Sequence, residues 1–252
     1  MPDEIKNIYE DARYADAYAR LEFPGTYYLA FRDLPDVFAR HVRPGRARAR
    51  AKLRALDFGC GAGRSTRFLA RCGFDAAGVD ISRDMVALAQ QRDPAGDYRG
   101  IGDGDFSGLA PASFDLVFAA FPFDNVPTRE RKVRILMGLR ALLAPEGRLV
   151  NLVSSPEIYV HEWVSFTTRD FPENRRALSG DAVRIINLAV AGGTPVTDVL
   201  WTDDAWREVY AASGFEPVEV LRPLAREGEL AGAEWVSETS VAPWTIWVLG
   251  PR

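Results

Sequence analysis

A glycine-rich segment, residues 56–65, is the part of the sequence whose residue types and spacing indicate chemistry most directly. It reads Leu-Asp-Phe-Gly-Cys-Gly-Ala-Gly-Arg-Ser and joins an apolar run to a helical pattern. Glycines at such a turn let the backbone bend tightly and approach a ligand closely, and the start of the following helix offers unpaired amides. The segment therefore predicts a site for a nucleotide-like ligand at a first βα turn.

The glycine spacing separates two kinds of nucleotide site. The segment fits G-x-G-x-G, whereas the dinucleotide fingerprint G-x-G-x-x-G needs glycine where this chain has Arg64. Asp57 would repel a pyrophosphate and attract a cation. At about 4 Å and a local dielectric of about 20, the interaction energies of like and opposite unit charges differ by several kcal/mol. An adenosine ligand with a charged amino acid and a sulfonium, S-adenosylmethionine, satisfies both features. Asp80, at the end of the next predicted strand, is placed to accept its ribose hydroxyls, and a helix cap is the alternative role.

Short apolar runs alternate with helical patterns from residue 53 onward, which predicts βαβ units with a parallel sheet. Ser82 and Thr202 are predicted helix N-caps, because a side-chain hydroxyl accepts a bond from an amide near the helix start. One expected strand ends at Phe58, and the others span residues 75–80, 98–101, 114–121, 148–153, 217–221 and 245–249. The expected helices span residues 65–72, 82–88 and 128–143, and a further helix begins at residue 202.

Two stretches fall outside this alternation. Before residue 53, the spacing of Tyr14, Tyr18 and Leu21 predicts an aromatic helix face, a second helix runs to about His41, and a basic tether follows. Residues 155–201 interrupt the alternation and offer strands at residues 183–188 and 195–200. We therefore predict a helical lid and tether over residues 1–52, a binding domain over residues 53–252, and a substrate cap inserted at residues 155–201. The aromatic residues of lid and cap suit an acceptor pocket or, alternatively, a homodimer interface.

Composition excludes several classes of protein. The 252 residues carry a formal charge of −4 and a pI of about 5.4, which disfavours nucleic acid as a partner. Two cysteines and two histidines are too few and too scattered for a zinc site, so no metal is expected. No apolar run approaches the roughly 20 residues of a membrane helix, and the charged first twenty residues do not fit a secretory signal. A soluble, cytoplasmic protein is expected.

Five motifs in order resemble those of the class I S-adenosylmethionine-dependent methyltransferases. They lie at residues 56–63, 78–82 with Met85, 102–106, 113–117 and 142–149. The resemblance covers about residues 53–154. It implies an α/β fold, a Rossmann-like seven-stranded, mostly parallel sheet flanked by helices, with the last strand antiparallel.

The resemblance also implies the cofactor contacts. Gly59 to Gly61 would contact the methionine part, Asp80 the ribose, and the second and third motifs the adenine. The third motif departs from the family's usual Leu-Pro-Phe continuation, so Phe106 either stacks on the adenine or belongs to the core. Arg64 either reaches the methionine carboxylate or extends into water. The predicted contacts are Asp57, Gly59, Cys60, Gly61, Arg64, Asp80, Ile81, Met85, Asp103, Gly104, Asp105, Phe106 and Phe121.

Methyl transfer is an in-line displacement in which positioning and exclusion of water do most of the work, so no catalytic triad is needed. An acceptor hydroxyl or protonated amine still has to lose one proton. His161, which follows the fifth strand, is the predicted base, with a surface histidine as the alternative. Tyr28 is predicted to hydrogen-bond the acceptor.

The acceptor is predicted from the end of the fourth strand. Phe121-Pro122-Phe123 lacks the polar residue and the second proline that amino-methylases of nucleic-acid bases carry there. We therefore expect methylation of an oxygen or nitrogen of a small, planar or apolar organic molecule. The alternatives are an NAD(P)-binding oxidoreductase and a non-catalytic S-adenosylmethionine-binding protein.

Overall fold

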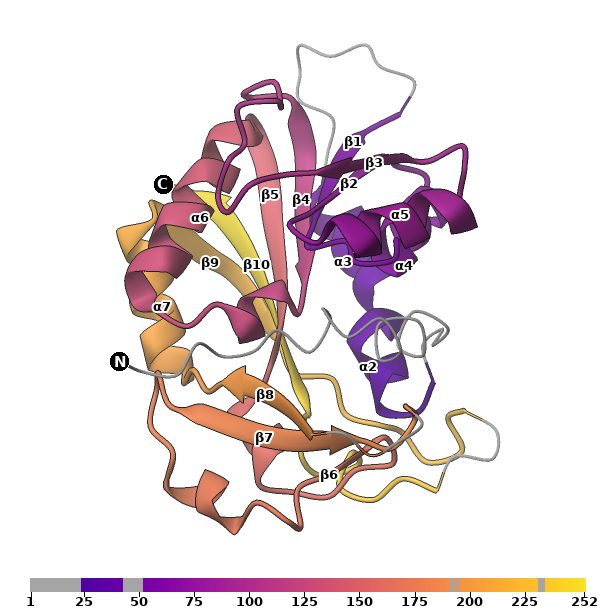
Figure 1. Ribbon diagram of the computed structural model, residues 1–252, viewed down its shortest axis with the longest axis vertical. Helices are drawn as coiled ribbons and strands as arrows, with labels where there is room; N and C mark the ends of the chain where they lie inside the picture. The colour runs from indigo at the N-terminus through magenta and orange to yellow at the C-terminus, as the bar shows by residue number, and fades with distance from the viewer. Residues whose placement is uncertain (1–23, 43–51, 191–192, 194, 231–233) are drawn as a thin grey trace.

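The computed structural model describes residues 24–42, 52–190, 193, 195–230 and 234–252. In this part of the chain, the main sheet has seven strands in the order β3-β2-β1-β4-β5-β10-β9 (Figure 1). Only β10 runs against its neighbours, pairing antiparallel with β5 and β9, so the predicted fold class is confirmed. The strands are β1 (Arg54–Phe58), β2 (Asp75–Asp80), β3 (Asp97–Gly100), β4 (Phe114–Ala120), β5 (Leu143–Ser154), β9 (Phe215–Leu221) and β10 (Trp244–Pro251).

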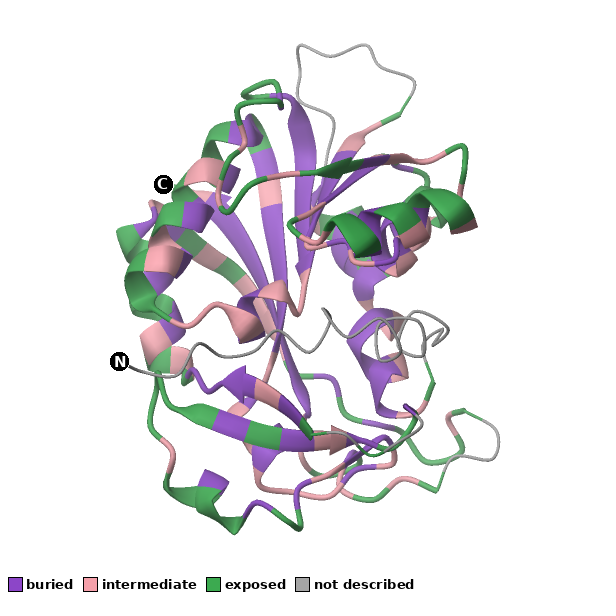
Figure 2. Ribbon diagram, viewed as in Figure 1, coloured by how far each residue is buried: buried purple, intermediate pink, exposed green. Residues whose placement is uncertain are grey.

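Helices cover both faces of this sheet, and the central strands are buried between them (Figure 2). On one face α2 (Thr26–Arg32), α3 (Leu34–His41) and α4 (Arg64–Arg71) share an apolar cluster with the sheet. On the other face α6 (Arg129–Leu142) and α7 (Asp203–Ala212) share a second cluster. The remaining helix, α5 (Arg83–Arg92), packs on β2 and β3. The Ser82 and Thr202 hydroxyls accept from Met85 and Ala205 amides, which confirms both predicted caps.

The insertion forms a small sheet of its own. β6 (Phe166–Thr167), β7 (Ala182–Asn187) and β8 (Pro195–Val199) pair antiparallel in that order. Figure 1 shows this small sheet beyond the end of the main sheet where β5 ends and β10 begins. Two of its strands match the predicted residues 183–188 and 195–200, whereas β6 was not predicted. Among the residues that the structure describes, three connections contain a short 3₁₀ helix: η2 (Pro122–Asn125), η3 (Pro156–Tyr159) and η4 (Pro172–Arg176).

The strand order reverses direction between β1 and β4, and the loops that follow these two strands leave from the same edge of the sheet. In open α/β sheets, ligands bind in the crevice at such a switch point. The predicted helix face with Tyr14, Tyr18 and Leu21, and most of the basic tether, lie outside the described residues. The division into lid, domain and cap stays a prediction. Among the helices of the described part, none has the length and apolarity needed to cross a bilayer.

Candidate functional site

The glycine loop after β1 adopts a backbone that few other residues tolerate. Gly59, Gly61 and Gly63 have φ angles of +73°, +51° and +80°, in the left-handed region. A Cβ added to Gly59 would lie 2.4 Å from the Cβ of Pro122, the first residue of η2. The glycine loop and the segment after β4 therefore touch at the switch point, and only glycine permits this approach.

Asp80, at the end of β2, is bound to the glycine loop. Its Oδ2 accepts from the Gly61 amide at 2.8 Å and its Oδ1 from the Ser82 amide at 2.8 Å. A backbone hydrogen bond from Ile81 also reaches this carboxylate, which offers about four lone-pair sites, so Asp80 keeps capacity for a ligand hydroxyl. Burial raises the pKa of Asp80 from its ordinary value. Ile81 next to it is 51% exposed and offers an apolar surface at the strand end.

Asp57 lies buried beneath the loop, and the expectation that its carboxylate attracts a cationic group stays a prediction. It is fully buried, and its Oδ2 accepts from the hydroxyls of Ser65 and Thr66 at 2.6 Å each. Its Oδ1 is buried without a hydrogen-bond partner among the described residues. Burial raises the pKa of Asp57 to about 6. The first turn of α4 covers this side chain, so Asp57 joins β1 to α4 beneath the loop.

Three further predicted contacts are also packing residues. Cys60 is buried with residues of α5 and β3, and burial raises the pKa of its thiol well above the usual value. Met85 is buried against Ala62, under the loop. Phe106 lies 5.9 Å from the Phe58 ring, and its ring would be within 2.6 Å of a Cβ at Gly138. Cys60 and Met85 are buried, whereas Phe106 is only partly buried and packs against the second apolar cluster.

The segment after β3 carries the remaining adenine-side residues. Asp103 forms ion pairs with Arg131 and Arg134 of α6 at 3.0 Å each. Gly104 has a φ angle of +67°, and the exposed Asp105 accepts from the Ser107 amide at 3.0 Å. These residues lie at the surface, where the structure leaves the backbone accessible to a ligand.

Arg64 begins α4 and points toward α2 instead of water. Its guanidinium lies 5.1 Å from the centre of the Tyr27 ring and 5.9 Å from that of Phe31. Tyr27 also lines a pocket next to the switch point, so its ring contacts both Arg64 of α4 and this pocket.

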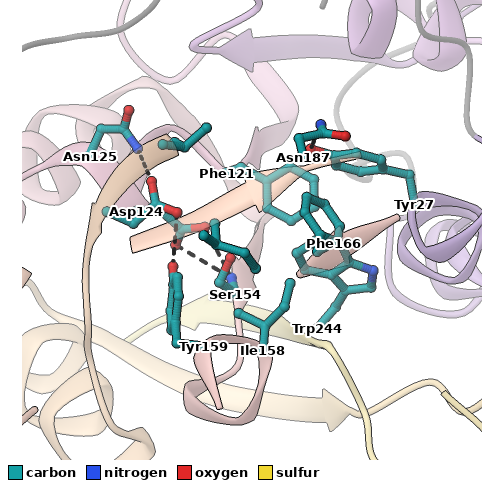
Figure 3. Close-up of a pocket in the computed structure, with 13 residues that line it drawn as sticks. Tyr27, Phe121, Asp124, Asn125, Ser154, Ile158, Tyr159, Phe166, Asn187 and Trp244 are labelled. Carbon is teal, nitrogen blue, oxygen red and sulfur yellow. Dashed lines mark hydrogen bonds between the residues drawn. The ribbon is translucent and has the colours of Figure 1, made fainter. Parts of the chain in front are cut away.

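This aromatic pocket lies between α2, the segment after β4, the small sheet and the start of β10 (Figure 3). Four rings form its apolar wall, and Trp244 is central to them, with ring centroids 5.5 Å from Tyr27, 4.7 Å from Phe121 and 5.7 Å from Phe166. Its free volume is about 40 Å³, enough for a few waters or one small head group. The lining residues are Tyr27, Phe121, Asp124, Asn125, Ser154, Ile158, Tyr159, Phe166, Ile185, Asn187, Val196, Asp198 and Trp244.

Phe121, one of the four wall residues, has an unusual backbone conformation. Its φ angle is +70°, in the left-handed region that bulky residues rarely adopt. The Phe121 amide still donates to the Leu152 carbonyl at 2.9 Å, and the next residue begins η2. Such strain costs on the order of 1–3 kcal/mol and concentrates at functional sites. The turn places Phe121 in the pocket and Pro122 against Gly59.

Two buried carboxylates form the polar end of the aromatic pocket. Asp198 of β8 accepts from the Asn125 amide nitrogen at 2.8 Å and from the Tyr159 hydroxyl at 3.0 Å. Asp124 accepts from the Ser154 backbone amide, with N–O distances of 3.1 and 3.4 Å to its two oxygens. Desolvation raises the pKa of both carboxyl groups.

Lys132 supplies a positive charge behind this end of the pocket. It is fully buried, its ammonium donates to the Phe123 carbonyl, and it lies 4.9 Å from the ring centres of Trp201 and Trp206. Desolvation lowers the pKa of Lys132, while the two carboxylates raise it. Lys132 is not among the residues that line the pocket.

The two predicted acceptor-side residues lie elsewhere. His161 lines a second hollow, which shares Tyr159 with the aromatic pocket, together with Glu162, Arg169 and Arg175, and its ring is 6.1 Å from that of Trp163. The Tyr28 hydroxyl donates to Glu229 at 3.4 Å, and its neighbour Tyr27 lines the pocket instead. On a helix, adjacent residues point in different directions, which explains why only one of the pair reaches the pocket.

Sequence reasoning missed the acidic end of the pocket although signals for it exist. Asp124 lies in the segment that directly follows the fourth strand. Asp198 is the one acidic residue in the short predicted strand at residues 195–200. Lys132 lies three residues before Ile135, on the buried stripe of α6. Each is a charged residue at an apolar position of its pattern, which is where buried functional charges are found.

Comparison with known proteins identifies the class. The family model "Methyltransferase domain" matches residues 56–149. Trans-aconitate 2-methyltransferase of Rhodopseudomonas palustris is 36% identical over 206 residues, which cover 76% of this chain and 70% of that protein. A ubiquinone biosynthesis O-methyltransferase of Methylococcus capsulatus is 33% identical over 31% of this chain. This match covers only 34% of that protein's own length. A ubiquinone biosynthesis O-methyltransferase of Xanthomonas euvesicatoria is likewise matched over only 42% of its length.

A solved structure agrees at the level of the fold. Magnesium protoporphyrin IX methyltransferase from Synechocystis, with bound S-adenosylhomocysteine (SAH), has a TM-score of 0.62 and 17% identity over 97% of this chain and 96% of that one. The chain belongs to the class I S-adenosylmethionine-dependent methyltransferases. Its cofactor is S-adenosylmethionine, and the oxidoreductase alternative is set aside.

The residues present fit this cofactor. Three left-handed glycines open the loop for a close backbone approach, Asp80 keeps acceptor capacity for ribose hydroxyls, and Ile81 leaves an apolar surface beside it. These residues lie at the switch point of the sheet, where this fold class binds its ligands.

Proposed function

We propose that this enzyme methylates an oxygen or nitrogen of a small organic molecule whose head group enters the aromatic pocket. The observation that carries the proposal is the contact between Gly59 and Pro122, because it joins the cofactor loop to the segment that supplies Phe121 and Asp124 to the pocket. When bound, S-adenosylmethionine supplies a methyl group on a sulfonium. The chain's own residues hold the acceptor and exclude water.

Gly59, Gly61, Asp80 and Ile81 are the proposed cofactor contacts, with the backbone at Gly104. Tyr27, Phe121, Phe166 and Trp244 are the proposed acceptor walls, which suit an apolar or planar group.

The pocket argues against an anionic acceptor. Aconitate, named in one relative, is a tricarboxylate, whereas this pocket is lined by two carboxylates and by no lysine, arginine or histidine among the described residues. Recognition of a carboxylate normally uses arginine or lysine. We therefore do not extend the relative's named substrate to this chain.

Two measurements test the proposal. Calorimetry with S-adenosylmethionine, SAH and NAD should show binding of the first two and none of NAD. Release of SAH should then depend on an added acceptor. If none of a broad panel of hydroxyl and amine acceptors yields SAH although the cofactor binds, the proposed reaction is wrong.

A further inference from the structure

The carboxylates at the polar end of the aromatic pocket can accept more hydrogen bonds than the chain supplies to them. An ionised carboxylate offers about four lone-pair sites. The Asp124 carboxylate is buried, and Ser154 is its donor residue: the Ser154 amide lies 3.1 and 3.4 Å from the two oxygens, and the Ser154 hydroxyl also bonds the carboxylate. Buried polar groups normally have hydrogen-bond partners, and Asp124 is one of the residues that line the pocket (Figure 3). A ligand that brings N–H donors would complete the site.

The charges of the site also favour a cation. Two carboxylates, Asp124 and Asp198, face one ammonium, Lys132, so the fully ionised group carries one surplus negative charge. Tyr159 and Tyr210 are the other titratable groups near it, and burial raises the pKa of both phenols. Lys132 stays behind the wall, bound to the Phe123 carbonyl, and leaves the pocket side of the carboxylates open.

The opposite wall suits the same ligand. Tyr27, Phe121, Phe166 and Trp244 surround the space with ring faces and edges. Aromatic rings attract cations through their quadrupole, and most strongly in desolvated sites. Aromatic rings on one side and carboxylates on the other is the chemistry that recognises an alkylammonium. The free volume of about 40 Å³ admits such a head group.

We infer that the acceptor is an organic amine whose nitrogen is held by Asp124 and Asp198 within the four rings, and that Asp124 takes the proton released on methylation. This rests on the proposed function of the pocket as the acceptor site. Asp124 is chosen because it lies two residues after Pro122, which touches the cofactor loop. In addition, the Ser154 amide lies 3.1 and 3.4 Å from its oxygens, whereas the donors to Asp198 lie at 2.8 and 3.0 Å.

The reaction balances without a further reagent. A protonated amine gives one N–H proton to the Asp124 carboxylate, and the freed nitrogen lone pair forms the new N–C bond. The C–S bond breaks, and its electron pair goes to sulfur, which becomes a neutral thioether. The product is the methylated amine in its protonated form, and the proton on Asp124 passes to solvent.

Calorimetry of the full chain with benzylamine, benzyl alcohol and benzoate tests the inference without cofactor. The three probes share a ring and differ in head-group charge. We expect benzylamine to bind at least tenfold more tightly than the other two, and Asp124→Asn to abolish this preference. Asp97→Asn removes a carboxylate from a surface pair with Arg99, far from the pocket lining, and should leave the preference intact.

Removing Asp124 leaves Lys132 as a buried charge with one carboxylate fewer, which could unfold the chain. The double variant Asp124→Asn, Lys132→Met restores the balance, and it should fold and still lack the preference. Equal or undetectable binding of benzylamine, or a preference that survives in the folded double variant, overturns the inference. If S-adenosylmethionine binds and benzyl alcohol is methylated as fast as benzylamine, the inference fails while the proposed function stands.

Discussion

At the scale of single residues, Asp57 couples the folded state to pH. Burial raises its pKa from the ordinary 3.8 to about 6 in the folded chain. The folded state therefore binds this proton more tightly than the unfolded state does, so the contribution of Asp57 to stability is fully present below about pH 4 and is lost as pH rises through 6. The shift corresponds to about 3 kcal/mol.

Asp57→Asn should remove that dependence. An uncharged amide oxygen can still accept from Ser65 or Thr66, so the variant should fold. We expect its free energy of unfolding, measured by urea denaturation between pH 4 and 7, to fall by about 3 kcal/mol less than that of the wild type. Asp124 and Asp198 make the same contribution to the pH dependence of the wild type and of the variant, so the difference between the two profiles isolates Asp57. Parallel pH profiles would contradict the assignment.

His161 provides a second test at this scale. A general base typically contributes about 10²–10⁴-fold to rate. His161 lines the hollow on the other side of Tyr159 and is not among the residues that line the aromatic pocket, so we expect His161→Ala to keep turnover within about twofold of the wild type at saturating acceptor. A loss of about a hundredfold with unchanged cofactor affinity would restore the role predicted from the sequence.

At the scale of elements, the contact between the loop after β1 and η2 can be separated from simple backbone strain. Gly59 and Gly73 both have left-handed φ angles, +73° and +95°, but an added Cβ meets Pro122 at 2.4 Å only at Gly59 and has open space at Gly73. Gly73→Ala should cost about 1–2 kcal/mol and leave cofactor affinity unchanged.

Gly59→Ala should cost more stability and, in addition, weaken S-adenosylmethionine binding at least tenfold, because Pro122 and the loop must separate. Calorimetry and urea denaturation of both variants give the comparison. If the two variants lose cofactor affinity equally, the Pro122 contact is not what positions the loop.

The elements of the main sheet could be predicted from sequence because each carries its own local signal. The glycine loop, the Ser82 and Thr202 caps and the apolar period of α6 each lie within a few consecutive residues. β6 has only two residues and escapes any periodicity. Asp57 and Met85 were predicted as ligand contacts because position in a motif does not reveal burial, which depends on α4 and α5.

At the scale of the whole molecule, the aromatic pocket could not be predicted because its parts are distant in sequence. Tyr27, Asp124, Asp198 and Trp244 come from α2, η2, β8 and β10, and only the packing of the small sheet on the main one brings them together. The sequence indicated aromatic residues in these stretches but contained no pattern that pairs them.

Glu238 is the residue that joins these distant parts. It is fully buried, and its carboxylate accepts from the Thr26 hydroxyl at 2.7 Å, the Val164 amide at 2.8 Å and the Val236 amide at 2.9 Å. Thr26 also bonds Ser165 through its amide and hydroxyl, and its carbonyl accepts from the Trp244 indole at 2.8 Å. One carboxylate thus fixes the start of α2 against the insertion and the strand that carries Trp244.

Glu238→Gln should therefore loosen the aromatic pocket without disturbing the cofactor loop. The side-chain amide presents N–H groups to at least one of the three donors, and a buried mismatch of this kind costs about 1–3 kcal/mol. We expect the free energy of unfolding to fall by that amount and acceptor-dependent release of SAH to drop severalfold, because Tyr27 follows Thr26 into the pocket wall. Affinity for S-adenosylmethionine should stay within twofold. Glu234→Gln, at an exposed position of the same segment, should change none of these quantities. Loss of cofactor affinity in Glu238→Gln, or unchanged turnover despite the lost stability, would show that α2 does not shape the acceptor site.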